Sequence, residues 1–272
     1  MNDAAEGLVR LDRYPILGTA DRRPLVEGAR RRIAETGCAL FPGFVTEAAL
    51  AGMVTEANAA YERSFRREVS LPAYEKAPLE DVPISHPLRR KNPYKMFVAA
   101  ADLLLREGPI LRLYQSDELT RLVADVLREP ILYRVADPML NCVLTYMNEG
   151  DQHGWHFDAN DFVVSLLLQS AESGGEFEFA PWVRSDTDEN YGEVDRVMDG
   201  TSALTRRLRV EAGTLIVFCG KRALHRVAPV VGGRRRIIAL LSYDRTLEMH
   251  YSEALKMNAT GRAEVLPPTR RS

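Results

Sequence analysis

The sequence has few cysteines, no long apolar run and almost no net charge, and each of these absences excludes a class of protein. Its three cysteines, Cys38, Cys142 and Cys219, lie far apart in apolar surroundings, which predicts buried thiols in a reducing compartment and not a disulfide framework or a zinc cluster. No run approaches the roughly 18 consecutive apolar residues of a membrane span. The first residues also lack the pattern of a signal peptide. We therefore expect a soluble, cytoplasmic protein without a membrane partner.

The charge of the chain is nearly balanced, with 36 basic and 38 acidic residues among 272. It has no basic stripe with interleaved aromatic residues, which disfavours nucleic acid as a partner and favours a small-molecule substrate. Hydrophobic residues make up 46% and charged residues 27%, a composition typical of a globular protein with a sizeable core. We expect a single domain over residues 1–272. The sequence is compatible with a homodimer but does not identify the oligomeric state.

The N-terminal part, residues 1–129, is predicted to be mainly helical. Residues 22–37 have apolar residues at helical spacing and end at Gly37, and "CALFPGF" then indicates a short strand and a turn. Thr46 is placed to cap a second helix. A third helix is predicted over residues 117–128, with Asp117 in the capping position.

A polar, proline-containing segment over residues 66–95 interrupts this helical part. Its composition fits neither a helix nor a strand, so we expect a long loop there. Loops of this length in compact domains often act as lids over an active site. The segment carries "HPLRRKNPY", which includes Arg90.

After Pro130 the pattern changes to short runs of Val, Leu, Ile, Phe and Tyr separated by Gly, Asn and Asp. Residues 130–245 are therefore predicted to form an antiparallel β-barrel or jelly roll. A charged, weakly patterned insert at residues 183–207 interrupts the strands, and residues 246–272 are left as a C-terminal tail.

One of these predicted strands carries the chemistry. His156 and Asp158 in "WHFD" are separated by one residue, so on an extended strand both side chains project from the same face. His225 in "ALHRVAPV" supplies a third group from a later strand. Two imidazoles and one carboxylate on one face of a metal leave three positions open, which suits non-haem Fe(II) that activates dioxygen. The sequence thus predicts His156, Asp158 and His225 as metal ligands and catalytic centre.

An arginine cluster follows His225 in "GGRRRIIALLSYD", a strand whose apolar residues predict burial. A buried arginine needs an anion, and its planar fork suits a carboxylate such as that of a dicarboxylate co-substrate. Arg236 is the first candidate, and strand parity puts Arg234 on the same face and Arg235 on the other.

These motifs resemble the Fe(II)/2-oxoglutarate-dependent oxygenase superfamily, whose pattern is His-x-Asp, a distal His and an Arg soon after it. The resemblance covers residues 130–245 and implies a mainly β fold: a double-stranded β-helix (jelly-roll, cupin-like) core with N-terminal helices packed on it. It also implies that His156, Asp158 and His225 bind Fe(II), that Arg236 or Arg234 binds 2-oxoglutarate, and that O2 is the oxidant.

A narrower resemblance connects "GDQHGWHFDANDFVVSLLLQ" and "LSYDR" with the branch of free amino acid halogenases and hydroxylases, of which the lysine enzymes are the type. In those halogenases glycine replaces the acidic ligand and leaves a coordination site for chloride. Asp158 stands at that position here, so the resemblance implies a dioxygenase that hydroxylates an unactivated C–H bond of a free L-amino acid with a basic or polar side chain.

Candidate substrate contacts follow from what an amino acid needs. His153 lies near the mouth of the site, Arg90 offers a cation for the substrate carboxylate, Asp161 and Asp137 offer an anion for its ammonium, and Trp155 offers a pocket wall. His153 and Asp161 are alternatively groups that orient the metal ligands. The ordinary alternatives are a solvated turn histidine for His153, a solvated basic face for Arg90 and a core position for Trp155.

Other functions stay open at this point. The same core can act on a peptide, a protein or another natural product, or can bind metal and 2-oxoglutarate as a non-catalytic sensor. A zinc hydrolase also uses two histidines and a carboxylate, but it leaves Arg236 unexplained.

Overall fold

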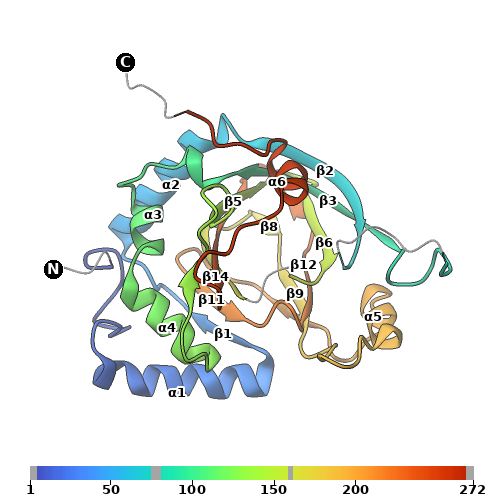
Figure 1. Cartoon of the computed structure of the whole chain (residues 1–272), viewed down its shortest axis with the longest axis horizontal. Helices are drawn as coiled ribbons and strands as arrows, with labels where there is room; N and C mark the ends of the chain where they lie inside the picture. The colour runs from blue at the N-terminus through green and yellow to red at the C-terminus, as the bar shows by residue number, and fades with distance from the viewer. Residues whose placement is uncertain (1–4, 75–80, 159–161, 268–272) are drawn as a thin grey trace.

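The computed structural model describes residues 5–74, 81–158 and 162–267, and its main feature is one antiparallel sheet that curls around a central space (Figure 1). The sheet has twelve strands. Ten follow each other in the order β1 (Cys38–Phe41), β11 (Leu215–Phe218), β7 (Phe162–Gln169), β14 (Arg236–Asp244), β5 (Cys142–Met147), β3 (Lys91–Ala99), β6 (Gln152–His156), β12 (Leu224–Val227), β9 (Phe177–Ala180) and β10 (Arg206–Leu208). β2 (Phe65–Pro72) pairs with β3, and β4 (Tyr133–Arg134) pairs with β14. A short separate pair consists of β8 (Ser173–Gly174) and β13 (Val230–Val231). The predicted jelly-roll core is confirmed.

Helices from the N-terminal part pack on one face of this sheet, as Figure 1 shows. They are α1 (Thr19–Thr36), α2 (Glu47–Tyr61), α3 (Pro109–Tyr114) and α4 (Asp117–Leu127), with a short 3₁₀ turn at Ala101–Leu103. Local signals set their ends. Gly37 closes α1 in the left-handed conformation, with φ 83°, and the Thr46 side chain accepts the Ala49 N–H at the start of α2. Both predicted boundaries are confirmed.

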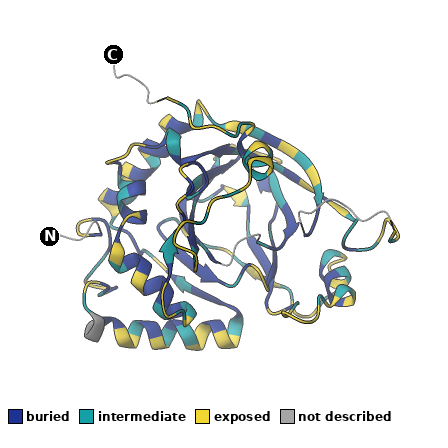
Figure 2. Cartoon of the chain, in the orientation of Figure 1, coloured by how far each residue is buried: buried dark blue, intermediate teal, exposed yellow. Residues whose placement is uncertain are grey.

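Alternation along β14 separates the two faces of the sheet. Ile237, Ala239 and Leu241 are buried in the layer between sheet and helices, whereas Arg236, Ile238, Leu240 and Ser242 line the central pocket. Figure 2 shows the result, with buried strands inside and exposed residues on the outer side of the helices. The strand period of two therefore fixes which side chains reach the pocket.

The structure corrects the expected loop at residues 66–95. Its two ends are the strands β2 and β3, which pair along their whole length from Phe65↔Val98 to Pro72↔Lys91. β2 is polar because its outer face is exposed, and this hid the strand in the sequence. The connection between the two strands is residues 73–90, of which 75–80 lie outside the described part.

Two segments for which the sequence predicted no element contain helices. The insert at residues 183–207 forms α5 (Tyr191–Met198) and leads into β10. The tail contains α6 (Glu253–Thr260), which is capped by the Ser252 side chain. The expected cap of α4 needs correction: it is Ser116, whose side chain accepts the Leu119 N–H, while Asp117 lies in the first turn. In the part of the chain that the structure describes, no helix is both long and apolar enough to pass through a membrane.

Candidate active site

The three predicted metal ligands come together at one end of the central space. His156 is the last residue of β6, and Asp158 lies two residues further along the chain. His225 lies in β12, which pairs with β6 so that His225 is opposite His156. Residues far apart in the sequence therefore meet because two neighbouring strands are in this register.

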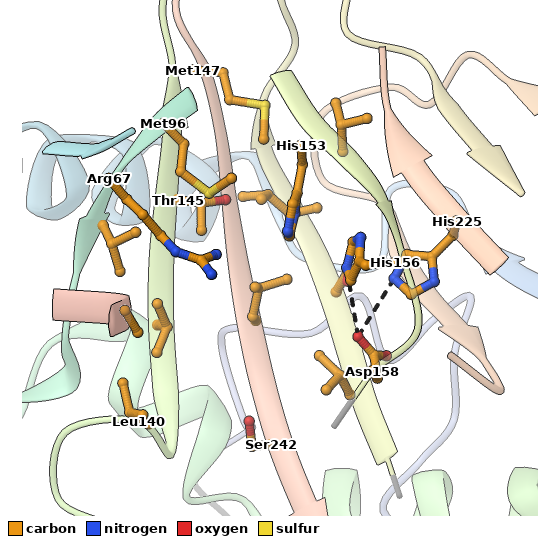
Figure 3. Close-up of a pocket in the computed structure, with 18 of the residues that line it drawn as sticks. Arg67, Met96, Leu140, Thr145, Met147, His153, His156, Asp158, His225 and Ser242 are labelled. Carbon is orange, nitrogen blue, oxygen red and sulfur yellow. Dashed lines mark ion pairs between the residues drawn. The ribbon is translucent and has the colours of Figure 1, made fainter. Parts of the chain in front are cut away.

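The donor atoms of the three triad side chains face one another (Figure 3). Asp158 Oδ1 lies 3.9 Å from His156 Nε2 and 3.4 Å from His225 Nε2. Each imidazole places its Nδ1 within hydrogen-bond distance of a backbone carbonyl, His156 at 2.8 Å from Gly154 O and His225 at 2.9 Å from Ala223 O. When Nδ1 carries the proton, Nε2 presents its lone pair, as a metal ligand requires. One donor atom from each of the three side chains lies within 4.8 Å of the other two.

The electrostatics of the triad also suit a metal. Burial, and next to it the neighbouring His225, lower the pKa of His156 to about 3, so His156 is neutral at physiological pH. The second carboxylate oxygen of Asp158, Oδ2, is buried and has no hydrogen-bond partner among the described residues. The neutral His156 imidazole and the unpartnered carboxylate oxygen of Asp158 belong to a donor set that fits a divalent cation.

His153 reaches the same pocket because β6 contains a bulge. Opposite β12, His156 pairs with His225 and His153 pairs with Val227, so β6 uses one residue more than its partner. His153 therefore stacks on His156, with ring centroids 3.9 Å apart. On a regular strand, residues three positions apart would point to opposite faces of the sheet. The bulge needs Gly154, since a Cβ there would lie 2.7 Å from the backbone carbonyl oxygen of Pro93 in β3. Burial first, and then His156, lower the pKa of His153 well below its usual value.

Arg236 is the arginine of the cluster that the structure places in the pocket. It is 3% exposed, and its Nη1 has no hydrogen-bond partner among the described residues. Burial lowers the pKa of its guanidinium to about 10, which still leaves it cationic at neutral pH. Gly175 lies against its side chain, because a Cβ at Gly175 would be 3.0 Å from Arg236 Cδ. A buried cation with an unsatisfied donor fits a carboxylate.

The other two arginines of the cluster lie elsewhere. Arg234 is exposed and donates hydrogen bonds to the carbonyls of Ser170 and Ala171, so the structure does not bring this predicted co-substrate residue to the pocket. β14 begins only at Arg236, and strand parity does not extend back to Arg234. Arg235 faces the helices and stacks over the Tyr61 ring at 3.3 Å.

A second pocket arginine, Arg67, was not predicted from the sequence. It lies on β2, and Figure 3 shows its guanidinium pointing into the pocket from the side opposite the triad. It is 8% exposed, its Nε donates to Asn258 Oδ1 at 3.3 Å, and it lies over the Tyr94 ring. The polar segment that was expected to be a loop thus supplies an inward-facing cation.

The remaining walls of the pocket are mostly apolar. They come from Met96, Val98, Leu140, Val143, Met147, Val163, Phe177, Ile216, Phe218, Val227, Ile238 and Leu240. Thr145, Ser165 and Ser242 add hydroxyl groups. α6 contributes Leu255, Asn258 and Ala259 to the lining, and Figure 1 shows this helix beside β2 and β3 at the rim of the curled sheet. The sequence signal that could have located α6 is "SEALKMNATG", a serine cap followed by a terminal glycine.

Three predicted substrate contacts do not reach this pocket. Arg90 pairs with Asp199 at 2.6 Å near α5. Asp137 is buried at the base of α6, where its carboxylate binds Lys256 Nζ at 2.8 Å. Trp155 faces away from the triad, with Arg226 over its ring.

The fourth, Asp161, lies outside the described residues. Of the predicted substrate contacts that the structure describes, His153 is therefore the one that lies at the triad.

Comparison with known structures supports the fold. An oxidoreductase of the 2OG-Fe(II) oxygenase family from Burkholderia pseudomallei aligns over 82% of this chain and 92% of its own, with 17% identity and a TM-score of 0.53. AviO1 from Streptomyces viridochromogenes aligns over 83% and 97%, with 17% identity and a TM-score of 0.57. HygX from Streptomyces hygroscopicus, solved with nickel, 2-oxoglutarate and hygromycin B, aligns over 82% and 89%, with 13% identity and a TM-score of 0.54.

No curated protein matches the sequence significantly. The family model described as Halogenase D, in contrast, matches residues 22–260, which include the helices, the sheet and α6. The chain therefore belongs to the Halogenase D family and, with it, to the superfamily of Fe(II)/2-oxoglutarate-dependent oxygenases.

Proposed function

We propose that this dioxygenase hydroxylates an unactivated C–H bond of a small carboxylate-bearing substrate, with free L-amino acids as the class to test first. The observation that carries the proposal is the intact His156, Asp158 and His225 set in a pocket that also holds two inward-facing arginines, Arg236 and Arg67. Fe(II), 2-oxoglutarate and O2 are the cofactor and co-substrates.

In this proposal the residues of the pocket have separate roles. His156, Asp158 and His225 hold the iron through Nε2, a carboxylate oxygen and Nε2. The bound iron, with 2-oxoglutarate and O2, supplies the oxidation that converts a substrate C–H into C–OH while 2-oxoglutarate becomes succinate and carbon dioxide. The protein binds and orients the two organic molecules, and its apolar walls exclude water.

Arg236 is proposed to bind the distal carboxylate of 2-oxoglutarate. Its position on β14 puts it on the pocket face of the sheet, and burial strengthens a charge-assisted hydrogen bond there because water does not compete. Thr145 and Ser242 are hydroxyl-bearing neighbours in the same pocket.

Hydroxylation is proposed over halogenation, despite the family's description, because of Asp158. Halogenases of the amino acid branch have glycine at this position, and the vacancy receives chloride. Here the carboxylate is present and Oδ1 lies close to both imidazoles, so it fills the position that a halide needs. The triad therefore favours transfer of oxygen to the substrate.

The pocket also supports a choice of substrate. Arg67 faces the triad from the opposite wall and offers a cation for a substrate carboxylate, and His153 lies beside the triad. Among the described pocket residues, Asp158 is the sole carboxylate, so a basic side chain would find no acidic partner in this part of the site. The lining instead favours an aliphatic body, and a pocket lined on one side by α6 and otherwise by inward-facing strand residues favours a small molecule over a folded protein.

The test is turnover with a substrate panel. Fe(II)-loaded protein is incubated with 2-oxoglutarate, air and chloride, together with aliphatic, polar and basic L-amino acids and simple carboxylic acids, and succinate and product mass are measured. The proposal expects succinate coupled to a product heavier by one oxygen. A chlorinated product contradicts the role given to Asp158, and binding of iron and 2-oxoglutarate without turnover by any small molecule favours a peptide oxygenase or a sensor.

A further inference from the structure

Gly220 lies against the Asp158 carboxylate, in the turn that joins β11 to β12. The backbone N–H of Asp158 donates to the Gly220 carbonyl at 3.1 Å, so the two residues are connected through the main chain. The turn leads directly to His225 on β12. A single short segment therefore touches one member of the triad and carries another.

The backbone at Gly220 does not itself require glycine. Ten glycines of the described chain have a positive φ, and Gly220 is not among them. An L-residue can therefore adopt its conformation, and the reason for glycine must be space.

The space at Gly220 is occupied by Asp158. A Cβ built at Gly220 would lie 1.8 Å from Asp158 Oδ2, 2.6 Å from its Cγ and 3.2 Å from its Cβ. These three nearest atoms all belong to Asp158, so one methyl group would collide first with the carboxylate. The carboxylate is the far end of a side chain and would rotate away before the turn itself moved.

No hydrogen bond among the described residues holds Oδ2 in its place. Packing against the bare Gly220 backbone is thus what limits the rotation of the carboxylate on this side. On the other side Oδ1 faces His156 and His225.

We infer that Gly220 is a positioning residue for the metal site: its missing side chain is the space in which the Asp158 carboxylate is held in line with His156 and His225. The inference rests on the proposed function, because it assigns Asp158 to the metal. It adds a residue that no ligand motif contains. An alanine at this position turns the carboxylate away from the metal while leaving all three ligands in the sequence.

The experiment is a double-mutant cycle read by metal binding, not by turnover. Co(II) affinity is measured by equilibrium titration for the unmodified protein, Gly220→Ala, Asp158→Gly and the double variant. Gly220→Ala is expected to weaken Co(II) binding by at least about tenfold, as loss of a supporting contact at a metal ligand typically does. In the Asp158→Gly background the same alanine is expected to change the affinity by less than about twofold, because the carboxylate it collides with is gone.

Gly233→Ala is the matched control. Gly233 also has no positive φ, and a Cβ there would have no atom within 4 Å, so this variant should bind Co(II) as the unmodified protein does.

Equal Co(II) affinity of Gly220→Ala and the unmodified protein would overturn the inference and leave the proposed function standing. An equal loss in both backgrounds would also overturn it, because Gly220 would then serve the turn and not the carboxylate. If Gly220→Ala does not fold, a folded double variant supports the inference and an unfolded one contradicts it. Absence of Co(II) binding by the unmodified protein overturns both the inference and the proposed metal site.

Discussion

Replacing Arg236 by methionine tests the assignment of the co-substrate site. The side chain is 3% exposed, and its Nη1 has no partner among the described residues, so a bound carboxylate would meet a cation with little competition from water. Hydrogen bonds to charged groups contribute about 1.5–3 kcal/mol, which corresponds to a loss of about 10- to 150-fold in affinity. Methionine keeps much of the length and apolar contact of the arginine stem, so the fold should persist.

The assay is calorimetric titration of 2-oxoglutarate into metal-loaded protein without oxygen, with thermal unfolding to verify the fold. Arg234→Met is the matched control. Arg234 is exposed and binds the carbonyls of Ser170 and Ala171, so its loss should leave the affinity for 2-oxoglutarate unchanged within about twofold. The reasoning is refuted if Arg236→Met binds 2-oxoglutarate as the unmodified protein does, or if Arg234→Met loses as much affinity.

Three more predictions follow from other parts of the structure. Arg67→Met should raise KM for the substrate by about tenfold or more without changing 2-oxoglutarate affinity, because it removes the proposed substrate anchor alone; steady-state kinetics and calorimetry check this. Gly154→Ala should lower the free energy of unfolding by about 1–3 kcal/mol relative to Gly233→Ala in urea, since its methyl group meets the backbone of β3. Burial acts to raise the pKa of Asp137, but Lys256 and two backbone N–H groups outweigh it and leave the pKa below its usual value. The ionised Asp137 carboxylate therefore stabilises the folded state fully above about pH 4, and this contribution is lost as the pH falls through the pKa of the folded state. The difference in free energy of unfolding between the unmodified protein and Asp137→Asn, measured in urea, should be largest at pH 7 and decrease towards pH 3.

The fold and the triad could be predicted because their signals are local. Runs of strand-forming residues between turn residues predicted the sheet, and Gly37 and Thr46 predicted the end of α1 and the start of α2. His156 and Asp158 lie close in sequence, and both are located at the end of one strand, β6. His225 was predicted as the third ligand from its place in a later strand, but the sequence could not show its position, since only the register of β12 on β6 brings it opposite His156.

The substrate side of the site could not be predicted, because it depends on contacts between distant segments. Arg67 lies on a strand whose exposed outer face made its sequence look like a loop, and only pairing with β3 aligns it with the pocket. The bulge at Gly154 moves His153 onto the face of His156 and leaves Trp155 on the other, which strand parity alone does not show. Asp137 was expected near a substrate ammonium, but α6 brings Lys256 to its carboxylate.

The proximity of Gly220 to Asp158 shows another limit of motif reading. The motif names the three ligands, but the space that lets the carboxylate face them comes from a turn on the opposite strand. Two chains with the same three ligands can therefore differ in metal geometry through a residue that is not itself a metal ligand.

The most direct test of the central claim is a crystal structure of the protein grown without oxygen in the presence of Fe(II) and 2-oxoglutarate. We expect a metal ion bound by His156 Nε2, His225 Nε2 and a carboxylate oxygen of Asp158, with 2-oxoglutarate on the metal and its distal carboxylate on Arg236. A metal that lacks Asp158 among its ligands, or 2-oxoglutarate bound away from Arg236, would contradict it.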